Sequence, residues 1–195
     1  ELLLNYGTKE QQTKYLPKLA SGKMIPCFGL TGPNNGSDAT GSIDKGKVVK
    51  DVDGNIKIEV IVNKRYITLA PVANLIGLAF ELEDPDKLLD NNQRGITVAL
   101  IEKKHPGLEQ KYYHNPLDVG FPNGTLKGTI LLDVDQVIGG IDNIGEGWKM
   151  LMECLAAGRG ICLPATANAS SKVAMSSMYL YSKHRKQFNI PLVEM

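Results

Sequence analysis

Residues 27–38 and 64–68 carry side chains suited to holding a planar ligand that forms hydrogen bonds. The first segment runs from an apolar, strand-like stretch into a Pro-Asn-Asn-Gly turn, where backbone amides become free to meet a ligand. The second predicts a strand with Tyr66 and Thr68 on one face. We interpret Tyr66 as a wall against a ring, with the hydroxyls of Thr31 and Thr68 as partners for the ring's polar edges.

The turn that follows the first segment has the composition of a rigid polar loop. Gly36 lets the chain pass close to a bound molecule, and Ser37 and Asp38 can bind the turn's own amides. The competing interpretation is an ordinary turn followed by an ordinary strand, because threonine and tyrosine favour strands in any case. Composition alone favours this plainer interpretation, and a resemblance decides against it.

Three motifs resemble the acyl-CoA dehydrogenase family and follow each other in the family's order. They are Leu-Thr-Gly-Pro-Asn-Asn-Gly-Ser-Asp at 30–38, Lys-Arg-Tyr-Ile-Thr at 64–68 and Gly-Glu-Gly-Trp-Lys-Met at 145–150. Further stretches similar to the family lie at 6–22, 158–160 and 185–188, so the resemblance covers essentially the whole chain. The segments most similar to the large bacterial enzymes of fatty-acid β-oxidation are 64–71 and 137–140.

The resemblance implies FAD-dependent α,β-dehydrogenation of a medium- or long-chain acyl-CoA to a trans-2-enoyl-CoA in fatty-acid β-oxidation. A carboxylate base removes the α-proton while the β-hydrogen leaves as hydride to the flavin, so base and flavin must lie on opposite faces of the acyl chain. The resemblance further implies an electron-transferring flavoprotein as partner. It also implies a homo-oligomer, a dimer or a tetramer, at full length.

Residue roles also follow from the resemblance. It implies that FAD is bound by Phe28, Leu30, Thr31, Tyr66, Thr68 and Arg185. It implies that acyl-CoA is bound by Gly36, Ser37 and Arg159, with Ser37 at the CoA arm. Leu30 and Thr31 would bond the pyrimidine edge of the flavin, and Arg185 resembles an arginine that meets the FAD pyrophosphate of a neighbouring subunit. For both arginines, a cation at a helix end is the plainer interpretation.

The catalytic base is not expected within this chain. Most members of the family carry that glutamate in a region beyond Met195, and a minority carry it just before the arginine that corresponds to Arg159, where this chain has Gly158. We therefore expect this piece to supply flavin and substrate walls and to be inactive alone. A flavin-dependent acyl-CoA oxidase on the same fold and a non-enzymatic acyl-CoA-binding or assembly module stay open as alternatives.

Composition and charge argue against several other classes of protein. The 195 residues, 43% of them hydrophobic, can bury the core of one or two domains. The net charge of +1, with no long run of one sign, argues against nucleic-acid binding. Cys27, Cys154 and Cys162 form no Cys-x-x-Cys pair, and the histidines are scattered, which argues against a disulfide framework or a metal site. We expect a cytoplasmic protein and leave membrane association through further segments open.

The pattern of elements predicts an α+β fold. Helical spacing over 9–19 is followed by an alternating segment at 56–62 and by further strand-like segments at 47–50, 75–82, 96–101 and 126–134. Several short strands separated by turn signals predict a small antiparallel β-barrel or sandwich. Apolar residues at helical spacing from Trp148 predict an amphipathic helix, and a second helical stretch covers 165–186. The resemblance implies that these are the first long helices of a C-terminal helical bundle. Glycines near 158–163 predict a break between the two helices.

Together with the resemblance to the acyl-CoA dehydrogenase family, this order implies three parts. We expect the end of an N-terminal helical domain over 1–24, a middle β-domain that binds flavin and acyl-CoA over 25–140, and the start of a C-terminal helical domain over 141–195. The chain opens without an initiator methionine, inside an apolar run, and closes just after a long helical stretch. We therefore expect it to be a piece of a longer protein.

Overall fold

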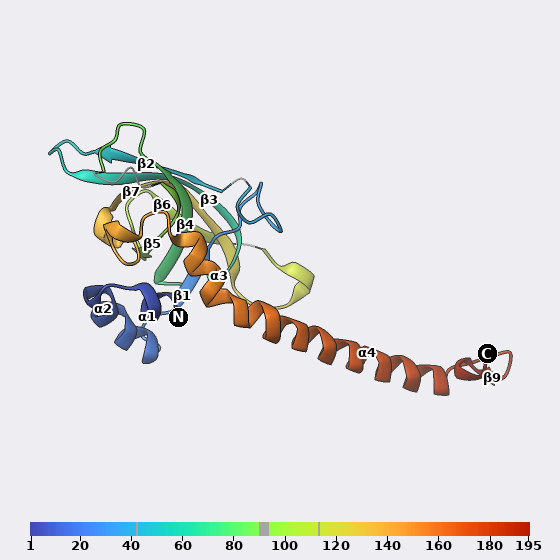
Figure 1. Cartoon of the computed structure of the whole chain (residues 1–195). Helices are drawn as coiled ribbons and strands as arrows, with labels where there is room; N and C mark the ends of the chain where they lie inside the picture. The colour runs from blue at the N-terminus through green and yellow to red at the C-terminus, as the bar shows by residue number, and fades with distance from the viewer. Residues whose placement is uncertain (42, 90–93, 113) are drawn as a thin grey trace. The chain divides into compact units, whose positions relative to one another are not determined.

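The computed structural model describes residues 1–41, 43–89, 94–112 and 114–195 (Figure 1). The chain divides into two compact units, Glu1–Leu151 and Met152–Met195. The first unit combines a curved sheet with two short helices, and the second is helical with a small hairpin. The α+β class predicted from the sequence is confirmed.

A mixed sheet forms most of the first unit. Its strands within the described residues are β1 (Pro26–Gly29), β2 (Lys45–Lys50), β3 (Ile56–Thr68), β4 (Leu75–Glu83), β5 (Gly95–Glu102), β6 (Leu108–Tyr112) and β7 (Asn123–Asp133). The strand order is β1-β4-β2-β3-β7-β6, with β5 also paired to β4. β1 and β2 run parallel to β4, and the remaining pairs are antiparallel. The sheet is thus mixed where the sequence predicted antiparallel pairing.

The core of the first unit lies inside the curve of the sheet. Strand β3 alternates buried and outward residues, whereas β4 is buried almost throughout, as expected for a central strand covered on both faces. Large side chains without exposed surface include Ile58, Ile76, Phe80, Leu126 and Leu132. Removing this apolar surface from water is the main driving force for folding.

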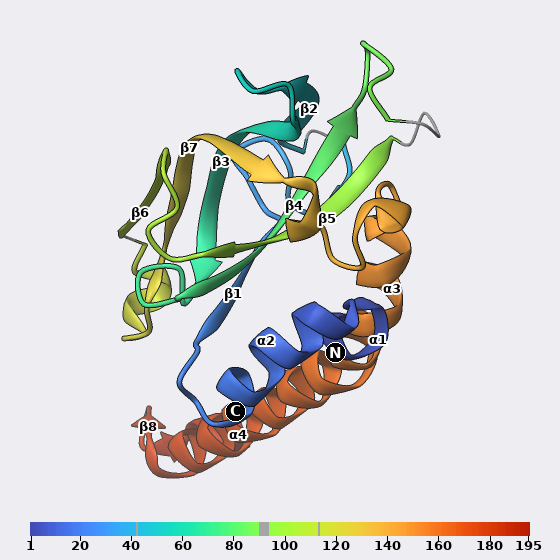
Figure 2. The ribbon, with the colours of Figure 1, turned by 90° about the vertical axis from the view of Figure 1, so that its left-hand side faces the viewer.

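Helices α1 (Leu2–Tyr6) and α2 (Lys9–Ala20) lie against the part of the sheet formed by β1, β4 and β5 (Figure 2). A capping box between Thr8 and Gln11 begins α2. Tyr15 on the same helix donates to Glu102 Oε1 over 3.2 Å. Single 3-10 turns in this unit span Pro116–Asp118, Val134–Gln136 and Ile141–Asn143.

Helix α3 (Gly147–Ala157) begins in the first unit and continues into the second. A π-helical turn (Gly158–Cys162) and α4 (Leu163–His184) follow it. The predicted interruption near 158–163 is present as this π turn, although the helix does not end there, because Ala157 and Leu163 on either side both have helical dihedrals. The glycines therefore accommodate a wider turn instead of ending the helix.

The chain closes with a small hairpin and a last turn. Strands β8 (Lys186–Gln187) and β9 (Ile190–Pro191) are joined by Phe188 and Asn189, both with positive φ, and a 3-10 turn spans Leu192–Glu194. Among the described residues, none of the helices has the length and apolar character needed to cross a membrane.

Candidate functional site

The first of the two segments singled out in the sequence is an excursion from the sheet. Strand β1 pairs with residues 75–78 of β4, and β2 pairs with residues 81–83 of the same strand. The described residues between β1 and β2, 30–41 and 43–44, therefore leave the sheet and return to it beside β4. We call residues 30–39 the ligand loop. It directly follows β1, so the pairing of β1 with β4 fixes where the loop begins.

Asn35 ties the ligand loop together from the inside. Its Oδ1 accepts from Gly32 N at 2.7 Å, and its Nδ2 donates to Leu30 O at 3.1 Å and to Ala39 O at 3.3 Å. The Asn35 side chain is buried, and its amide reaches across the turn in both directions. The loop is thus held by Asn35. The prediction that Ser37 and Asp38 bind the turn's amides is wrong for the described residues, where the Asp38 carboxylate accepts from Thr40 Oγ1 at 3.4 Å.

The second segment contains a β-bulge that turns its side chains outward. The pairing of β3 with β7 shifts between Lys64 and Ile67. Alternate residues of β3 are buried up to Lys64, after which Ile67 is buried while Tyr66 and Thr68 are exposed. Tyr66 has a φ of 62° and is 52% exposed. Bulges commonly re-aim side chains next to functional sites, and this one presents Tyr66 and Thr68 on the surface.

The two segments contact each other directly. Arg65 N donates to Thr31 O over 3.2 Å, and Arg65 Nη2 donates to Pro33 O over 3.2 Å. Lys64 Nζ donates to Leu30 O over 2.9 Å. Residues that lie more than thirty positions apart in the sequence therefore form one site, with the bulge against the ligand loop.

Among the described residues, three buried polar atoms without a hydrogen-bond partner belong to neighbours of Tyr66 or of Thr68. Its ring lies 4.3 Å from the His114 ring, centroid to centroid, with the planes tilted by 50°. Asn123 pairs with Thr68 across the sheet and is only 4% exposed. Within the described residues, Arg65 Nε, His114 Nε2 and Asn123 Oδ1 form no hydrogen bond. Such groups are costly to bury unsatisfied, which suits a polar ligand or ordered water at this position.

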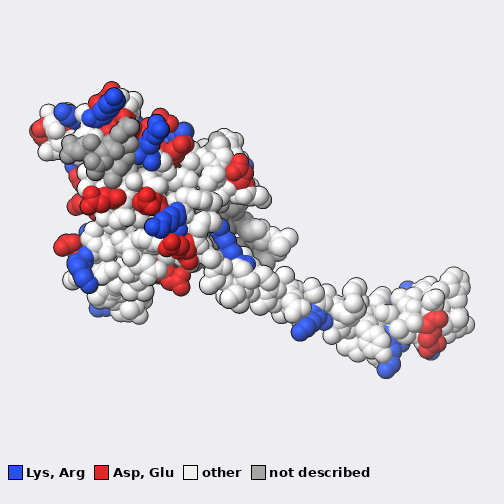
Figure 3. Space-filling model, in the orientation of Figure 1, with Lys and Arg blue, Asp and Glu red and all other residues white. Residues whose placement is uncertain are grey.

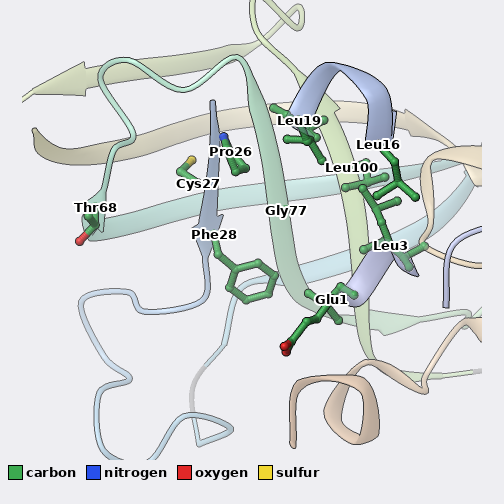
Figure 4. A pocket seen from close by; sticks show the side chains of 13 residues that line it. Glu1, Leu3, Leu16, Leu19, Pro26, Cys27, Phe28, Thr68, Gly77 and Leu100 are labelled. Atoms are coloured by element: carbon green, nitrogen blue, oxygen red, sulfur yellow. The ribbon is translucent and has the colours of Figure 1, made fainter. Parts of the chain in front are cut away.

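An apolar cavity of about 410 Å³ lies between α1, α2 and the strands β1, β4 and β5. Figure 4 shows Leu3 and Leu16 on the helical side and Phe28 on the strand side. Thr68 also lines the cavity, so two of the residues predicted to bind FAD border this space. Cys27 lines it as well, and burial raises the pKa of this thiol to about 12.

The remaining predicted site residues lie elsewhere. Gly36 and Ser37 are exposed on the ligand loop. Arg159 lies in the π turn and Arg185 follows α4, so both belong to the second unit, where both are exposed. The structure thus brings Leu30, Thr31, Tyr66 and Thr68 to neighbouring elements of the first unit, and it describes the two arginines within the second unit alone.

Four residues of the site were missed by sequence reasoning. They are Asn35, Lys64, His114 and Asn123. In β3 the even-numbered residues from 58 to 64 are buried, and position 64 follows Ile58, Val60 and Val62 in that alternation. This alternation could have indicated that Lys64 points into the core.

The surface of the first unit carries charges of both signs. Lysine and arginine side chains are interspersed with aspartate and glutamate on the face shown in Figure 3. In the part of the chain that the structure describes, no cluster of His, Cys, Asp and Glu could hold a metal ion. The site therefore offers hydroxyls, amides and an aromatic ring as its chemistry.

Comparison with known proteins gave related sequences, although no protein-family model matches the chain. The chain is 32% identical to "Acyl-CoA dehydrogenase" of Bacillus subtilis over 97% of its length and 47% of that protein. It is 30% identical to "(2S)-methylsuccinyl-CoA dehydrogenase" of Cereibacter sphaeroides over 100% of its length and 35% of that protein. A 98-residue part is 46% identical to "Protein HemX" of Proteus mirabilis, covering 49% of this chain and 58% of that protein.

Solved structures share the whole fold of the chain. The acyl-CoA dehydrogenase of Geobacillus kaustophilus superposes with a TM-score of 0.75 at 27% identity, covering 100% of this chain and 48% of that one. The butyryl-CoA dehydrogenase of Megasphaera elsdenii gives 0.71 at 26% identity, with the same coverage. The chain thus spans from about a third to somewhat over half the length of the proteins it matches.

Proposed function

The chain belongs to the acyl-CoA dehydrogenase family, and on that premise we propose that it forms the flavin-binding part of an enzyme that dehydrogenates an acyl-CoA with FAD. The observation that carries the proposal is the contact between the ligand loop and the bulged end of β3. This contact joins two of the three motifs on which the family resemblance rests, those at 30–38 and 64–68. It also leaves the hydroxyls of Thr31 and Thr68, the backbone amides of the ligand loop and the Tyr66 ring available to a ligand.

The residues present fit FAD. Thr31 and Thr68 offer hydroxyls, the ligand loop offers backbone amides, and the exposed Tyr66 ring offers a flat apolar surface. Asn123 Oδ1 offers a buried acceptor beside Thr68. When bound, FAD would supply the hydride acceptor. The protein's part in this proposal is to bind the pyrimidine edge through Leu30 and Thr31, to cover the ring with Tyr66 and Thr68, and to exclude water.

We further propose a medium- or long-chain acyl-CoA of fatty-acid β-oxidation as substrate. The 410 Å³ cavity supports this, because leucines dominate its lining and, among the described residues, neither lysine nor arginine lines it. A second carboxylate on the acyl chain would lack a cationic partner there. This argument favours a plain acyl chain over the branched dicarboxylic substrate named for the Cereibacter relative.

The full-length enzyme would pass its electrons to an electron-transferring flavoprotein and would be a homo-oligomer. In this proposal Gly36, Ser37 and Arg159 contact acyl-CoA, and Arg185 meets the FAD pyrophosphate of a neighbouring subunit. The catalytic base lies outside this chain. A cytoplasmic location is supported by Cys27 and Cys162, which form no disulfide.

The test is the visible spectrum of the full-length protein loaded with FAD, to which octanoyl-CoA is added without oxygen and air is admitted afterwards. Bleaching that persists in air supports the dehydrogenase. Rapid recolouring with hydrogen peroxide would favour an acyl-CoA oxidase. Bound flavin that does not bleach with octanoyl-CoA or with glutaryl-CoA would favour a binding module.

A pair of matched variants tests whether Thr68 takes part in this bleaching. Thr68→Val keeps the shape of the side chain and removes its hydroxyl, whereas Thr125→Val does the same to a neighbouring threonine on β7. We expect the first variant to slow bleaching and the second to leave it unchanged. Equal rates in the two variants would contradict the role given to Thr68.

A further inference from the structure

A fully buried lysine, Lys64, lies beneath the ligand loop and makes one of the contacts between that loop and β3. The Lys64 side chain has 0% of its surface exposed, although lysine is almost never buried without a partner. Its Nζ donates to Leu30 O at 2.9 Å and lies 3.3 Å from Asp44 Oδ2. Burial lowers the pKa of Lys64, and the Asp44 carboxylate opposes that shift. Both of these polar contacts are therefore made inside the protein.

The acidic partner of this lysine is itself fixed. Asp44 Oδ2 also accepts from Asn63 N at 2.9 Å, and Asp44 O accepts from Glu81 N at 2.8 Å. The carboxylate is thus held between β3 and β4. The sheet thus fixes both Lys64 and Asp44. The hydrogen bond from Lys64 Nζ to Leu30 O therefore fixes the ligand loop relative to the sheet.

The peptide between Leu30 and Thr31 is held from its carbonyl side. Leu30 O accepts from Asn35 Nδ2 as well as from Lys64 Nζ. In a trans peptide the carbonyl and the following N–H point in opposite directions. Since Lys64 approaches from the core, the Thr31 N–H is directed away from the core.

The charge on Lys64 also changes the donor strength of that N–H. A cation at the carbonyl oxygen draws electron density through the amide, which makes the N–H of the same peptide a better donor. The effect is strong because the contact is buried, where the effective dielectric constant is low. A neutral side chain of the same length could fill the space without this effect.

We propose that Lys64 is a positioning residue, which aims and polarises the Leu30–Thr31 peptide so that the Thr31 N–H binds the pyrimidine edge of the flavin. This inference rests on the proposed function. It adds a residue that touches neither cofactor nor substrate and acts through the backbone of the ligand loop.

The test compares Lys64→Met with Lys57→Met, a variant on the same strand whose lysine pairs with Asp133 at the surface. For each protein we would measure amide exchange without FAD, the dissociation constant for FAD, and the infrared carbonyl bands of bound FAD. In Lys64→Met we expect faster exchange in the ligand loop, a dissociation constant about tenfold higher, and carbonyl bands shifted to higher frequency. Lys64→Arg, which keeps a charged donor, should restore the bands in part.

A folded Lys64→Met protein with wild-type carbonyl bands would overturn the inference, even if its stability had fallen, because loss of packing alone does not change the hydrogen bonds to the flavin. If Lys64→Met does not fold, the NMR resonance of the Thr31 amide proton in the wild-type protein tests the inference instead. FAD should move its resonance downfield, and an unchanged resonance would overturn the inference. A wild-type protein that binds no FAD would refute the proposed function, while exchange in the FAD-free variants would still show whether Lys64 holds the loop.

Discussion

Individual residues of the site follow from the sequence only in part. Tyr66 and Thr68 do lie on one side of a strand, as their spacing predicts. Their exposure depends on the bulge after Lys64, and the bulge depends on pairing with β7, which the sequence of β3 alone does not reveal. The same bulge lets the buried pattern end on a lysine, whose burial is stabilised by Leu30 O and Asp44.

At the residue scale, we predict that iodoacetamide modifies Cys162 and spares Cys27 at pH 8. Cys162 is exposed, whereas Cys27 is 8% exposed and its pKa is raised by burial to about 12, so its reactive thiolate is scarce. Mass spectrometry of the alkylated peptides measures both sites. Equal modification of the two cysteines in the folded protein would contradict the burial of Cys27.

The raised pKa of Cys27 also predicts a dependence of stability on pH. The folded protein keeps the thiol proton between the ordinary pKa of 9.0 and about 12, while the unfolded chain loses it. Stability from this group is therefore full below pH 9 and falls as the pH rises toward 12. Urea unfolding at pH 8 and pH 10.5 should show a larger loss for wild type than for Cys27→Ala, and equal losses would contradict the assignment.

Elements were predicted more completely than residues. The helix over 9–19 and the strands over 56–62, 75–82 and 96–101 are all present. Apolar periodicity marks the buried face of the helix and of β3, whereas 75–82 is a short continuous apolar run bounded by turn signals, which is typical of a strand buried on both faces. Strand β6 was missed, since its five residues alternate weakly. The parallel pairing of β1 and β2 with β4 was missed too, because it depends on where the ligand loop leaves and rejoins the sheet.

At the element scale, Gln11 connects α2 to the chain after β7. Its Nε2 donates to Asp135 O at 2.9 Å and to Val137 O at 2.7 Å, and its Oε1 accepts from Gly139 N at 3.1 Å. Gln11→Ala should lower the free energy of unfolding by about 2–4 kcal/mol, because it leaves buried backbone groups unsatisfied. Gln12→Ala should cost clearly less, because Gln12 is only half-buried and its Nε2 donates to Leu3 O and, at an exposed position, to Leu4 O. Similar urea midpoints for the two variants would refute this role.

The close approach of β6 to β7 supplies a second prediction. Gly128 has a φ of +139°, and a Cβ there would lie 1.9 Å from Gly107 O. Gly128→Ala should therefore destabilise the protein by about 2 kcal/mol or more. Gly120→Ala, where a Cβ would meet no atom within 4 Å, is the matched control and should be nearly neutral. Thermal unfolding of both variants measures the difference, and a stable Gly128→Ala protein would argue against the β6–β7 pairing.

At the scale of the molecule, the sequence and the structure agree on an α+β chain with its β part first and its long helices last. The division into parts over 1–24, 25–140 and 141–195 stays a prediction. The structure shows two compact units and describes the ligand loop, the bulge and the apolar cavity all within the first. The family could be predicted from short motifs, and two of those motifs build one contact, between the ligand loop and β3.

The central claim is that this contact forms a flavin site, and hydrogen–deuterium exchange with and without FAD tests it most directly. We predict that FAD slows exchange in peptides covering 28–36 and 64–68 and leaves the β2–β3 hairpin at 50–56 unchanged. Binding of FAD with no protection of those two segments, or with protection confined to other parts of the chain, would contradict the account.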